Sequence, residues 1–266
     1  MTWFDEALHD GVTGQGYTQR FHVTRVIHHE ASEVQDLLVF ETPRFGRVLA
    51  LDGVVQTTEG DEFIYHEMLV HVPMVAHGAA RRVLIIGGGD SGALREVLRH
   101  PVERATMVEI DRSVVDLCRE HMPSLGAGAF EDPRTDLVIA DGIRYVADSA
   151  DAFDVIIVNS TDPIGPGGVL VTQCGVPFFQ GSEVTDSYRW LTPHFADVAF
   201  YVIAVPTYVG GFMTLGWASD DASLRSRTVD EITERVAGLG LATRYYTPGV
   251  HVGAFALPGY VGELID

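Results

Sequence analysis

VLIIGGGDSG, residues 83–92, decides the fold class of this chain. Four apolar residues typical of a buried strand run into a glycine-rich turn, and a helical pattern follows at Gly92–Arg99. A strand, a glycine turn and a helix in this order form the first half of a βαβ unit. The glycines let the backbone approach a ligand closely, and the start of the helix offers free N–H groups. We therefore expect a nucleoside-binding turn after this strand.

The alternation of strands and helices continues beyond this turn. Buried apolar strands separated by helices are typical of a parallel, doubly wound sheet. We predict strands at 83–86, 105–110, 136–140, 155–158, 169–174, 199–205, 212–218 and 251–256, and helices at 92–99, 112–122, 143–149 and 226–238.

The region before residue 60 has a different pattern, in which short β-rich runs alternate with turns. Asp52-Gly53 between two of these runs is a strong signal for a β-hairpin. A helical pattern follows at 61–77. We predict a small antiparallel β domain over residues 1–60 and a Rossmann-like domain over 61–266, with the mostly parallel, doubly wound sheet of class I methyltransferases.

Composition narrows the possible partners. A net charge of −19 argues against nucleic acid, whose phosphates require Lys and Arg, and favours a cationic ligand, although solubility alone also explains it. No apolar run approaches the roughly 18 residues that span a bilayer, and the N-terminus lacks the pattern of a signal peptide. Cys118 and Cys174 are the only cysteines and are expected in the core. We expect a cytoplasmic protein that binds neither nucleic acid nor a membrane.

Acidic residues at two strand ends point to a nucleoside. Glu109 ends the strand after the glycine turn, where a carboxylate binds both hydroxyls of a ribose. Asp90 within the turn would repel a pyrophosphate, which disfavours NAD and favours a cationic or uncharged nucleoside. Asp141, which precedes Gly142, either accepts a hydrogen bond from adenine or caps the next helix, and a cap can do both.

DVIIVNSTDPIGPGG, residues 154–168, places a stiff polar turn at the end of another strand. Its polar residues Asn159 and Asp162 fall at the edge of the sheet where ligands bind. Only ten residues separate Val158 from Val169, whereas parallel neighbours need a crossover of a dozen or more. Either the two strands are not parallel neighbours, or a connecting segment is missing.

Two further patterns have simpler interpretations. His66-Glu67 and His71 do not have the four-residue histidine spacing of a zinc helix, so we expect no metal. Asp111 is expected to start a helix, because acidic residues favour the positive N-terminus.

Blocks over nearly the whole chain resemble the polyamine aminopropyltransferases, most closely the bacterial spermidine synthases. The resemblance implies an N-terminal β domain on a Rossmann-like catalytic domain, assembled as a homodimer or homotetramer. It implies aminopropyl transfer to putrescine from decarboxylated S-adenosylmethionine, a co-substrate rather than a cofactor, giving spermidine and methylthioadenosine. The blocks are WFDE near the start, 45–68, 83–92, 107–111, 132–142, 160–166, 206–211 and 244–258.

The resemblance also implies roles for particular residues. Glu109 would hold the ribose, Asp141 the adenine, and Asp90 the ammonium of the aminopropyl arm, while Asp162 and Tyr208 would grip the diamine. The donor site would consist of Gln35, Gly87, Asp90, Glu109, Asp141 and Gly142. The diamine site would consist of Gln56, Tyr65, His66, Asp90, Asp162 and Tyr208.

The chain departs from the family pattern at three places. Asn159 stands where the family has its catalytic Asp base, and an amide cannot take a proton. Ser91 replaces a glycine, a mild change if its φ is negative. The family implies roughly twenty more residues between the PIGP turn and the next strand, forming a lid and crossover helix. We expect reduced activity from this chain.

Four alternatives remain open. The chain is an impaired variant, or the sequence lacks a segment of the real protein. It is a non-catalytic or weakly active paralogue that binds the nucleoside or polyamine. Or it is a polyamine methyltransferase on the same scaffold, which Asp90 and the block at 56–68 argue against. The sequence does not decide which amine is preferred.

Overall fold

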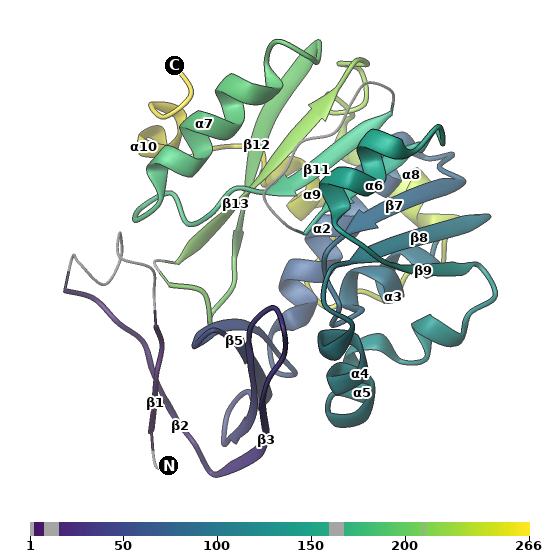
Figure 1. Ribbon diagram of the computed structural model, residues 1–266. Helices are drawn as coiled ribbons and strands as arrows, with labels where there is room; N and C mark the ends of the chain where they lie inside the picture. The colour runs from purple at the N-terminus through teal and green to yellow at the C-terminus, as the bar shows by residue number, and fades with distance from the viewer. Residues whose placement is uncertain (1–2, 8–15, 160–167, 210) are drawn as a thin grey trace.

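The computed structural model describes residues 3–7, 16–159, 168–209 and 211–266. A seven-stranded sheet has the order β12-β13-β11-β10-β7-β8-β9 (Figure 1). All its pairs are parallel except those that β13 makes with β11 and β12. The strands are β7 (Arg82–Ile86), β8 (Arg104–Glu109), β9 (Thr135–Ile139), β10 (Val155–Val158), β11 (Val169–Gln173), β12 (Asp197–Ala204) and β13 (Phe212–Ser219).

Helices cover both faces of this sheet, which confirms the doubly wound fold. Successive residues of a strand point to opposite faces, so Ile85 packs into the core beneath α2 and α3 while Leu84 packs toward α6 and α7. Burial on both faces explains why the strands are almost wholly apolar. The helices are α2 (Glu62–His77), α3 (Gly92–Leu98), α4 (Arg112–His121), α5 (Pro123–Gly126), η1 (Ala129–Glu131), α6 (Gly142–Asp148), α7 (Gly181–Leu191), α8 (Val229–Ala237), α9 (Pro248–Gly253) and α10 (Gly259–Gly262).

A four-stranded antiparallel sheet precedes the large sheet, as predicted. One face packs on α4 and α5 through Leu37 and Val39, and the other packs on the β1–β2 hairpin through Phe40. Asp52 and Gly53 turn the chain with φ of 49° and 78°, as a two-residue hairpin loop requires. The four-stranded sheet consists of β3 (Arg25–Ala31), β4 (Asp36–Thr42), β5 (Gly46–Leu51) and β6 (Val54–Thr58), while β1 (Trp3–Asp5) and β2 (Arg20–His22) form a separate two-stranded sheet.

The topology places a crevice beside β7. From β7 the chain proceeds to β8 and β9 on one side and then returns to β10 on the other. Ligands of open α/β sheets bind at such a switch point, outside the carboxyl ends of the strands.

The predicted strand at 251–256 is wrong. Pro248–Gly253 forms helix α9, because Thr247 accepts a hydrogen bond from the N–H of Val250 and Pro248 occupies the first turn. These are helix-start signals that outweigh the short β-like run. The helix predicted at 226–238 begins later, at Val229, where Thr228 forms a capping box.

The pairing of β10 with β11 tests whether the strands on either side of the short connection are parallel neighbours. They are parallel neighbours, with Val155 opposite Val169 and Val158 opposite Thr172. The idea that the two strands are not parallel neighbours is therefore wrong. Most of the turn between them, including Asp162, lies outside the described residues.

Two other sequence expectations concern burial and membranes. Cys118 and Cys174 are both buried and unpaired, and burial raises the pKa of each thiol, so they are core residues as expected. Across the described part of the chain, no helix is long and apolar enough to cross a membrane.

Candidate active site

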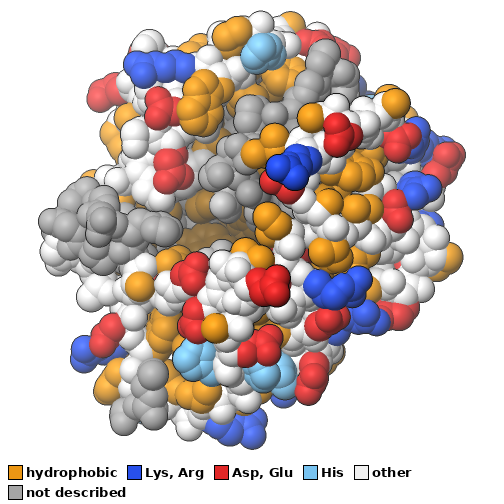
Figure 2. All heavy atoms as spheres, in the orientation of Figure 1, with side chains coloured by type: hydrophobic (Ala, Val, Ile, Leu, Met, Phe, Trp, Pro, Cys, Tyr) orange, Lys and Arg blue, Asp and Glu red, His pale blue; other side chains and the backbone are white. Residues whose placement is uncertain are grey.

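A cavity of about 760 Å³ lies at the carboxyl ends of β7, β8 and β10. The N-terminal sheet closes one side of it with Leu49, Leu51 and Gln56. Figure 2 shows a hollow on this face, between the N-terminal sheet below and the large sheet above. All predicted site residues that the structure describes line this cavity. They are Gln35, Gln56, Tyr65, His66, Gly87, Asp90, Glu109, Asp141, Gly142, Asn159 and Tyr208.

Glu109 is fixed by backbone hydrogen bonds at the wall of the cavity. Its Oε2 accepts from the N–H of Gly89 at 2.9 Å and its Oε1 from the N–H of Asp111 at 3.0 Å. Burial raises the pKa of this carboxyl above its usual range. A side chain at Gly89 would not fit, since a Cβ there would lie 2.9 Å from Val114 and 3.1 Å from Oε2 of Glu109. The carboxylate is therefore held rigidly at the cavity wall.

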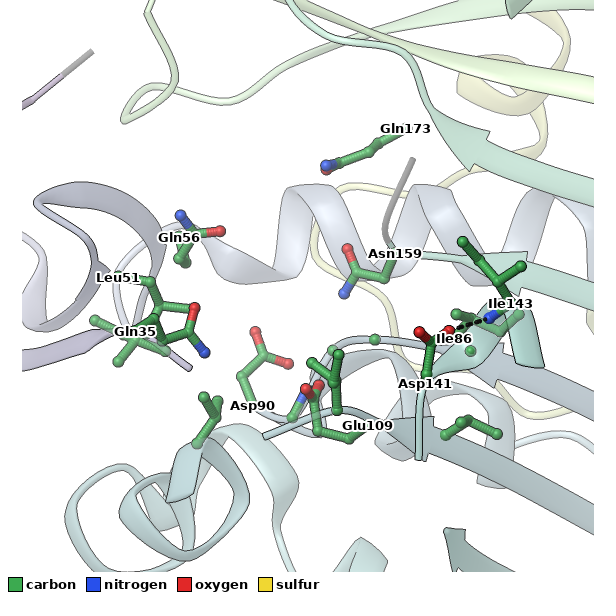
Figure 3. A pocket seen from close by; sticks show the side chains of 18 of the residues that line it. Gln35, Leu51, Gln56, Ile86, Asp90, Glu109, Asp141, Ile143, Asn159 and Gln173 are labelled. Carbon is green, nitrogen blue, oxygen red and sulfur yellow. Dashed lines mark hydrogen bonds between the residues drawn. The ribbon is translucent and has the colours of Figure 1, made fainter. Parts of the chain in front are cut away.

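Asp141 caps helix α6 beside Glu109. Its Oδ1 accepts from the N–H groups of Ile143 at 2.9 Å and Arg144 at 3.2 Å (Figure 3). The cap is thus confirmed, and the binding of adenine stays a prediction. Ile110 and Ile143 line the cavity nearby although 55% and 59% of their surfaces are exposed. A flat apolar ligand would remove these surfaces from water.

The glycine turn after β7 differs from the sequence-based expectation at one residue, Ser91. Ser91 has φ +65°, in the left-handed region, so its replacement of a glycine is not mild. This conformation costs a residue with a Cβ about 1 kcal/mol. The Oγ of Ser91 donates to the carbonyl of Asp90 at 2.5 Å.

Asp90 points into the middle of the cavity (Figure 3). Its Oδ1 accepts from the N–H of Gly92 at 2.9 Å, and its Oδ2 lies 3.4 Å from Nε2 of His66. Nδ1 of His66 lies 2.6 Å from Oε2 of Glu62. Burial alone would lower the pKa of His66, but Asp90 and Glu62 raise it to about 10. His66 is therefore an imidazolium at neutral pH.

Asn159 follows β10 and lies beside the glycine turn, because a Cβ at Gly88 would be 2.7 Å from its Nδ2. Its Oδ1 accepts from the hydroxyl of Tyr65 at 2.6 Å, and that hydroxyl lies 3.2 Å from Oε1 of Gln173. The Tyr208 hydroxyl donates to the carbonyl of Gln56 at 2.9 Å. Burial raises the pKa of both tyrosines far above their usual value, so both hydroxyls are protonated. Neither the three amides Asn159, Gln173 and Gln56 nor these two protonated tyrosines can take a proton at neutral pH.

Gln173 is a cavity residue that the sequence reasoning missed. It ends β11 and therefore reaches the same edge of the sheet as Asn159. The strand-end rule applied to Glu109 would have found it. Leu49 and Leu51 were also missed, and only the packing of the two sheets brings them to the site.

Gln35 and Asp111 meet behind Glu109. Nε2 of Gln35 donates to Oδ2 of Asp111 at 3.0 Å, while Oδ1 of Asp111 accepts from the N–H of Ser113 at 2.9 Å. Asp111 starts helix α4 as expected. Among the residues with described positions, His, Cys, Asp and Glu form no group suited to hold a metal ion.

Family models match both parts of the chain. A spermine/spermidine synthase domain matches residues 62–167, and a spermidine synthase tetramerisation domain matches residues 2–59.

Curated relatives match along the full length. A polyamine aminopropyltransferase of Pseudomonas syringae pv. tomato is 51% identical, covering 100% of this chain and 98% of that protein. Polyamine aminopropyltransferase 1 of Pseudomonas aeruginosa is 54% identical, with coverages of 100% and 98%. The alignment with the first spans 286 positions against the 266 residues of this chain, so that relative contains residues without a counterpart here.

Solved structures share the fold. Spermidine synthase from Thermotoga maritima has a TM-score of 0.90 and 36% identity, covering 99% of this chain and 93% of its own. A spermidine synthase in complex with the transition state analogue AdoDATO gives the same values.

Proposed function

The chain belongs to the spermine/spermidine synthase family, and we propose that it transfers an aminopropyl group from decarboxylated S-adenosylmethionine to putrescine. The amine nitrogen forms a bond to the carbon beside the sulfonium, and the carbon–sulfur bond breaks. Its electron pair neutralises the sulfur, so methylthioadenosine leaves, while the amine loses a proton to yield spermidine. The observation that carries this proposal is one cavity whose wall contains both Glu109 and Asp90.

The donor site consists of Gln35, Gly87, Asp90, Glu109, Asp141 and Gly142. We infer that Glu109 accepts from the ribose hydroxyls, because its carboxylate is held by two backbone N–H groups. Asp90 pairs with the terminal ammonium of the donor. An intact S-adenosylmethionine would place its own carboxylate beside Asp90, and this repulsion favours the decarboxylated donor.

The diamine site consists of Gln56, Tyr65, His66, Asp90, Asp162 and Tyr208, although Asp162 lies outside the described residues. Tyr65 and Tyr208 are in edge contact with ring centroids 5.8 Å apart. Their protonated hydroxyls and the neighbouring Asp90 suit a chain of methylenes that ends in an ammonium.

Asn159 occupies the position of the catalytic base, and we propose that it limits the rate. Only about one in a thousand primary ammonium groups is neutral at pH 7. A carboxylate would orient the ammonium and take its proton, whereas the amide oxygen of Asn159 can accept a hydrogen bond but cannot take the proton. The loss of a general base costs on the order of 10²–10⁴ in rate.

Incubation with putrescine and each adenosyl donor tests the proposed function. Release of methylthioadenosine from the decarboxylated donor is the expected result. Formation of S-adenosylhomocysteine from the intact donor would instead identify a methyltransferase. Retained binding without either product would identify a non-catalytic paralogue, the alternative that Asn159 favours.

We further propose an assembly and a location. The match of residues 2–59 to a tetramerisation domain supports a homo-oligomer, and we propose a homodimer or homotetramer. The two buried, unpaired cysteines support a cytoplasmic location. We place the domain boundary between residues 60 and 61, between β6 and α2.

A further inference from the structure

Glu62 lies one turn before His66 on α2, outside the cavity lining. Its side chain is buried and accepts from Nδ1 of His66 at 2.6 Å. It also accepts from Nη2 of Arg95 at 2.9 Å. A buried carboxylate with two cationic partners this close is a permanent anion. Glu62 does not line the cavity itself, but it contacts His66, which does.

His66 stands between two carboxylates, Glu62 and Asp90. Nδ1 faces Glu62 at 2.6 Å and Nε2 faces Asp90 at 3.4 Å. A neutral imidazole has one N–H, so only the doubly protonated ring can donate to both acids. The ring packs against Gly92, where a Cβ would lie 2.2 Å from its Cε1. The ring is thus fixed in one orientation.

Charge balance explains why both carboxylates are needed. An imidazolium paired with Asp90 alone would cancel the charge that Asp90 offers to a cationic ligand. Glu62 supplies a second negative charge, which leaves the three groups with a net charge of about −1. Arg95 contacts both Glu62 and Glu96, with its Nε 2.8 Å from Oε1 of Glu96, and Glu96 also pairs with Arg99.

We propose that Glu62 is a positioning residue that acts through His66. It holds His66 as an imidazolium, so that Asp90 is oriented by an ion pair with His66 and the three groups together stay negative toward an ammonium ligand. This inference rests on the proposed function, which places that ammonium at Asp90.

As a consequence, the affinity of Asp90 for a cation should not change with pH between 6 and 9. Because the pKa of His66 is raised to about 10, with Asp90 and Glu62 outweighing burial, the ring stays charged between pH 6 and 9. The groups that face it are Glu62 on its own helix, Asp90 from the turn after β7, Arg95 of α3 through Glu62, and the hydroxyl of Tyr208 across Tyr65.

In Glu62→Gln the buried imidazolium loses one of its two carboxylates, and its pKa falls. A cation bound at Asp90 then competes with the charge of His66 and displaces its proton. Affinity for the cation is therefore weakest at low pH and recovers as the pH rises through the lowered pKa of His66.

Two nucleosides isolate this effect. One is an adenosine thioether ending in an aminopropyl ammonium, and the other is methylthioadenosine, which has no ammonium. Calorimetry from pH 6 to 9 gives the ratio of their affinities. We expect a flat ratio in the wild type. In Glu62→Gln we expect it to be lower at pH 6 by about tenfold, with proton release on binding the ammonium ligand.

Two variants serve as controls. Glu67 is also buried on α2, but it accepts only backbone N–H groups of the segment 244–246. Glu67→Gln should lower the thermal stability and leave the ratio flat. The double variant Glu62→Gln with His66→Gln removes one charge of each sign, so it should abolish the pH dependence seen in the single variant.

The outcomes separate the two proposals. If the wild type binds neither nucleoside, the proposed function fails. If both bind and Glu62→Gln retains a flat ratio, the role of Glu62 is overturned. Should Glu62→Gln not fold, nitrogen NMR of His66 in the wild type decides, because a neutral ring at pH 8 contradicts the inference.

Discussion

Two side chains of the cavity wall are held in different ways. Glu109, at the proposed nucleoside end of the ligand, is held by backbone N–H groups, whose positions follow from the strand, the turn and the helix themselves. The side chain of Asn159, at the proposed amine end of the ligand, is held by another side chain, the hydroxyl of Tyr65. A site built on the backbone persists as long as the fold persists, whereas one made of side chains can change by a single substitution. In the proposed function, the nucleoside end therefore has its acid, Glu109, and the amine end has an amide at the position of the base.

Among these variants, Asn159→Asp should have the largest effect, and that effect is on the reaction rate. A carboxylate at the amine end restores a general base, so the rate of methylthioadenosine release should rise by about 10²–10⁴-fold at pH 7. In the wild type the rate should climb with pH toward the pKa of the amine, and the variant should flatten this profile. A matched control is Asn159→Ser, which also lacks a base. An unchanged rate in Asn159→Asp would place the defect elsewhere.

Glu109→Gln tests the nucleoside end. The amide keeps the shape but loses the charge, and one backbone N–H faces an NH₂ group instead of an acceptor. Affinity for methylthioadenosine should fall about 10–100-fold, since hydrogen bonds to charged groups contribute about 1.5–3 kcal/mol. Calorimetry measures this loss. Glu120→Gln, on an exposed side chain, is the control, and equal affinity in both variants would contradict the ribose role.

Tyr65→Phe probes how the amine end is held together. Asn159 loses its hydrogen-bond donor, so the free energy of unfolding should drop by about 1 kcal/mol and the rate with putrescine should fall. Tyr201→Phe removes a buried hydroxyl bonded to the carbonyl of Met68, outside the cavity lining. Both variants should lose stability in denaturant titrations, but only Tyr65→Phe should lose rate. If both variants lost rate to the same extent, the hydrogen bond from Tyr65 to Asn159 would have no specific role in the reaction.

Ser91→Gly has the smallest expected effect and acts at the nucleoside end. Ser91 has φ +65°, and glycine adopts this conformation without steric cost. The free energy of unfolding should rise by about 1 kcal/mol, measured by denaturant titration. A decrease would mean that the hydrogen bond of its Oγ to Asp90 outweighs the strain.

Patterns local to the chain predicted the fold class and the candidate residues at strand and helix ends, whereas Gln35, Gln56, Tyr65, His66 and Tyr208 came only from the resemblance to the family. Gly87 and Glu109 were found because strands that share a direction bring their carboxyl ends to one edge of the sheet. Asp141 and Asp111 were found because helix starts have their own side-chain chemistry. The helix α9 was mistaken for a strand, since six residues are too few for periodicity to outweigh β-like composition.

The amino-acid sequence specifies which chemical groups are available: an acid at the end of β8, an acid within the glycine turn, and an amide where the family has a base. Tertiary structure alone decided how they act. It made β10 and β11 parallel neighbours, and it brought Gln173, Leu49 and Leu51 to the cavity. It enclosed His66 between Glu62 and Asp90, which fixed its protonation. The physical reason is that charge and proton affinity depend on burial and on neighbours distant in sequence, which no local pattern contains.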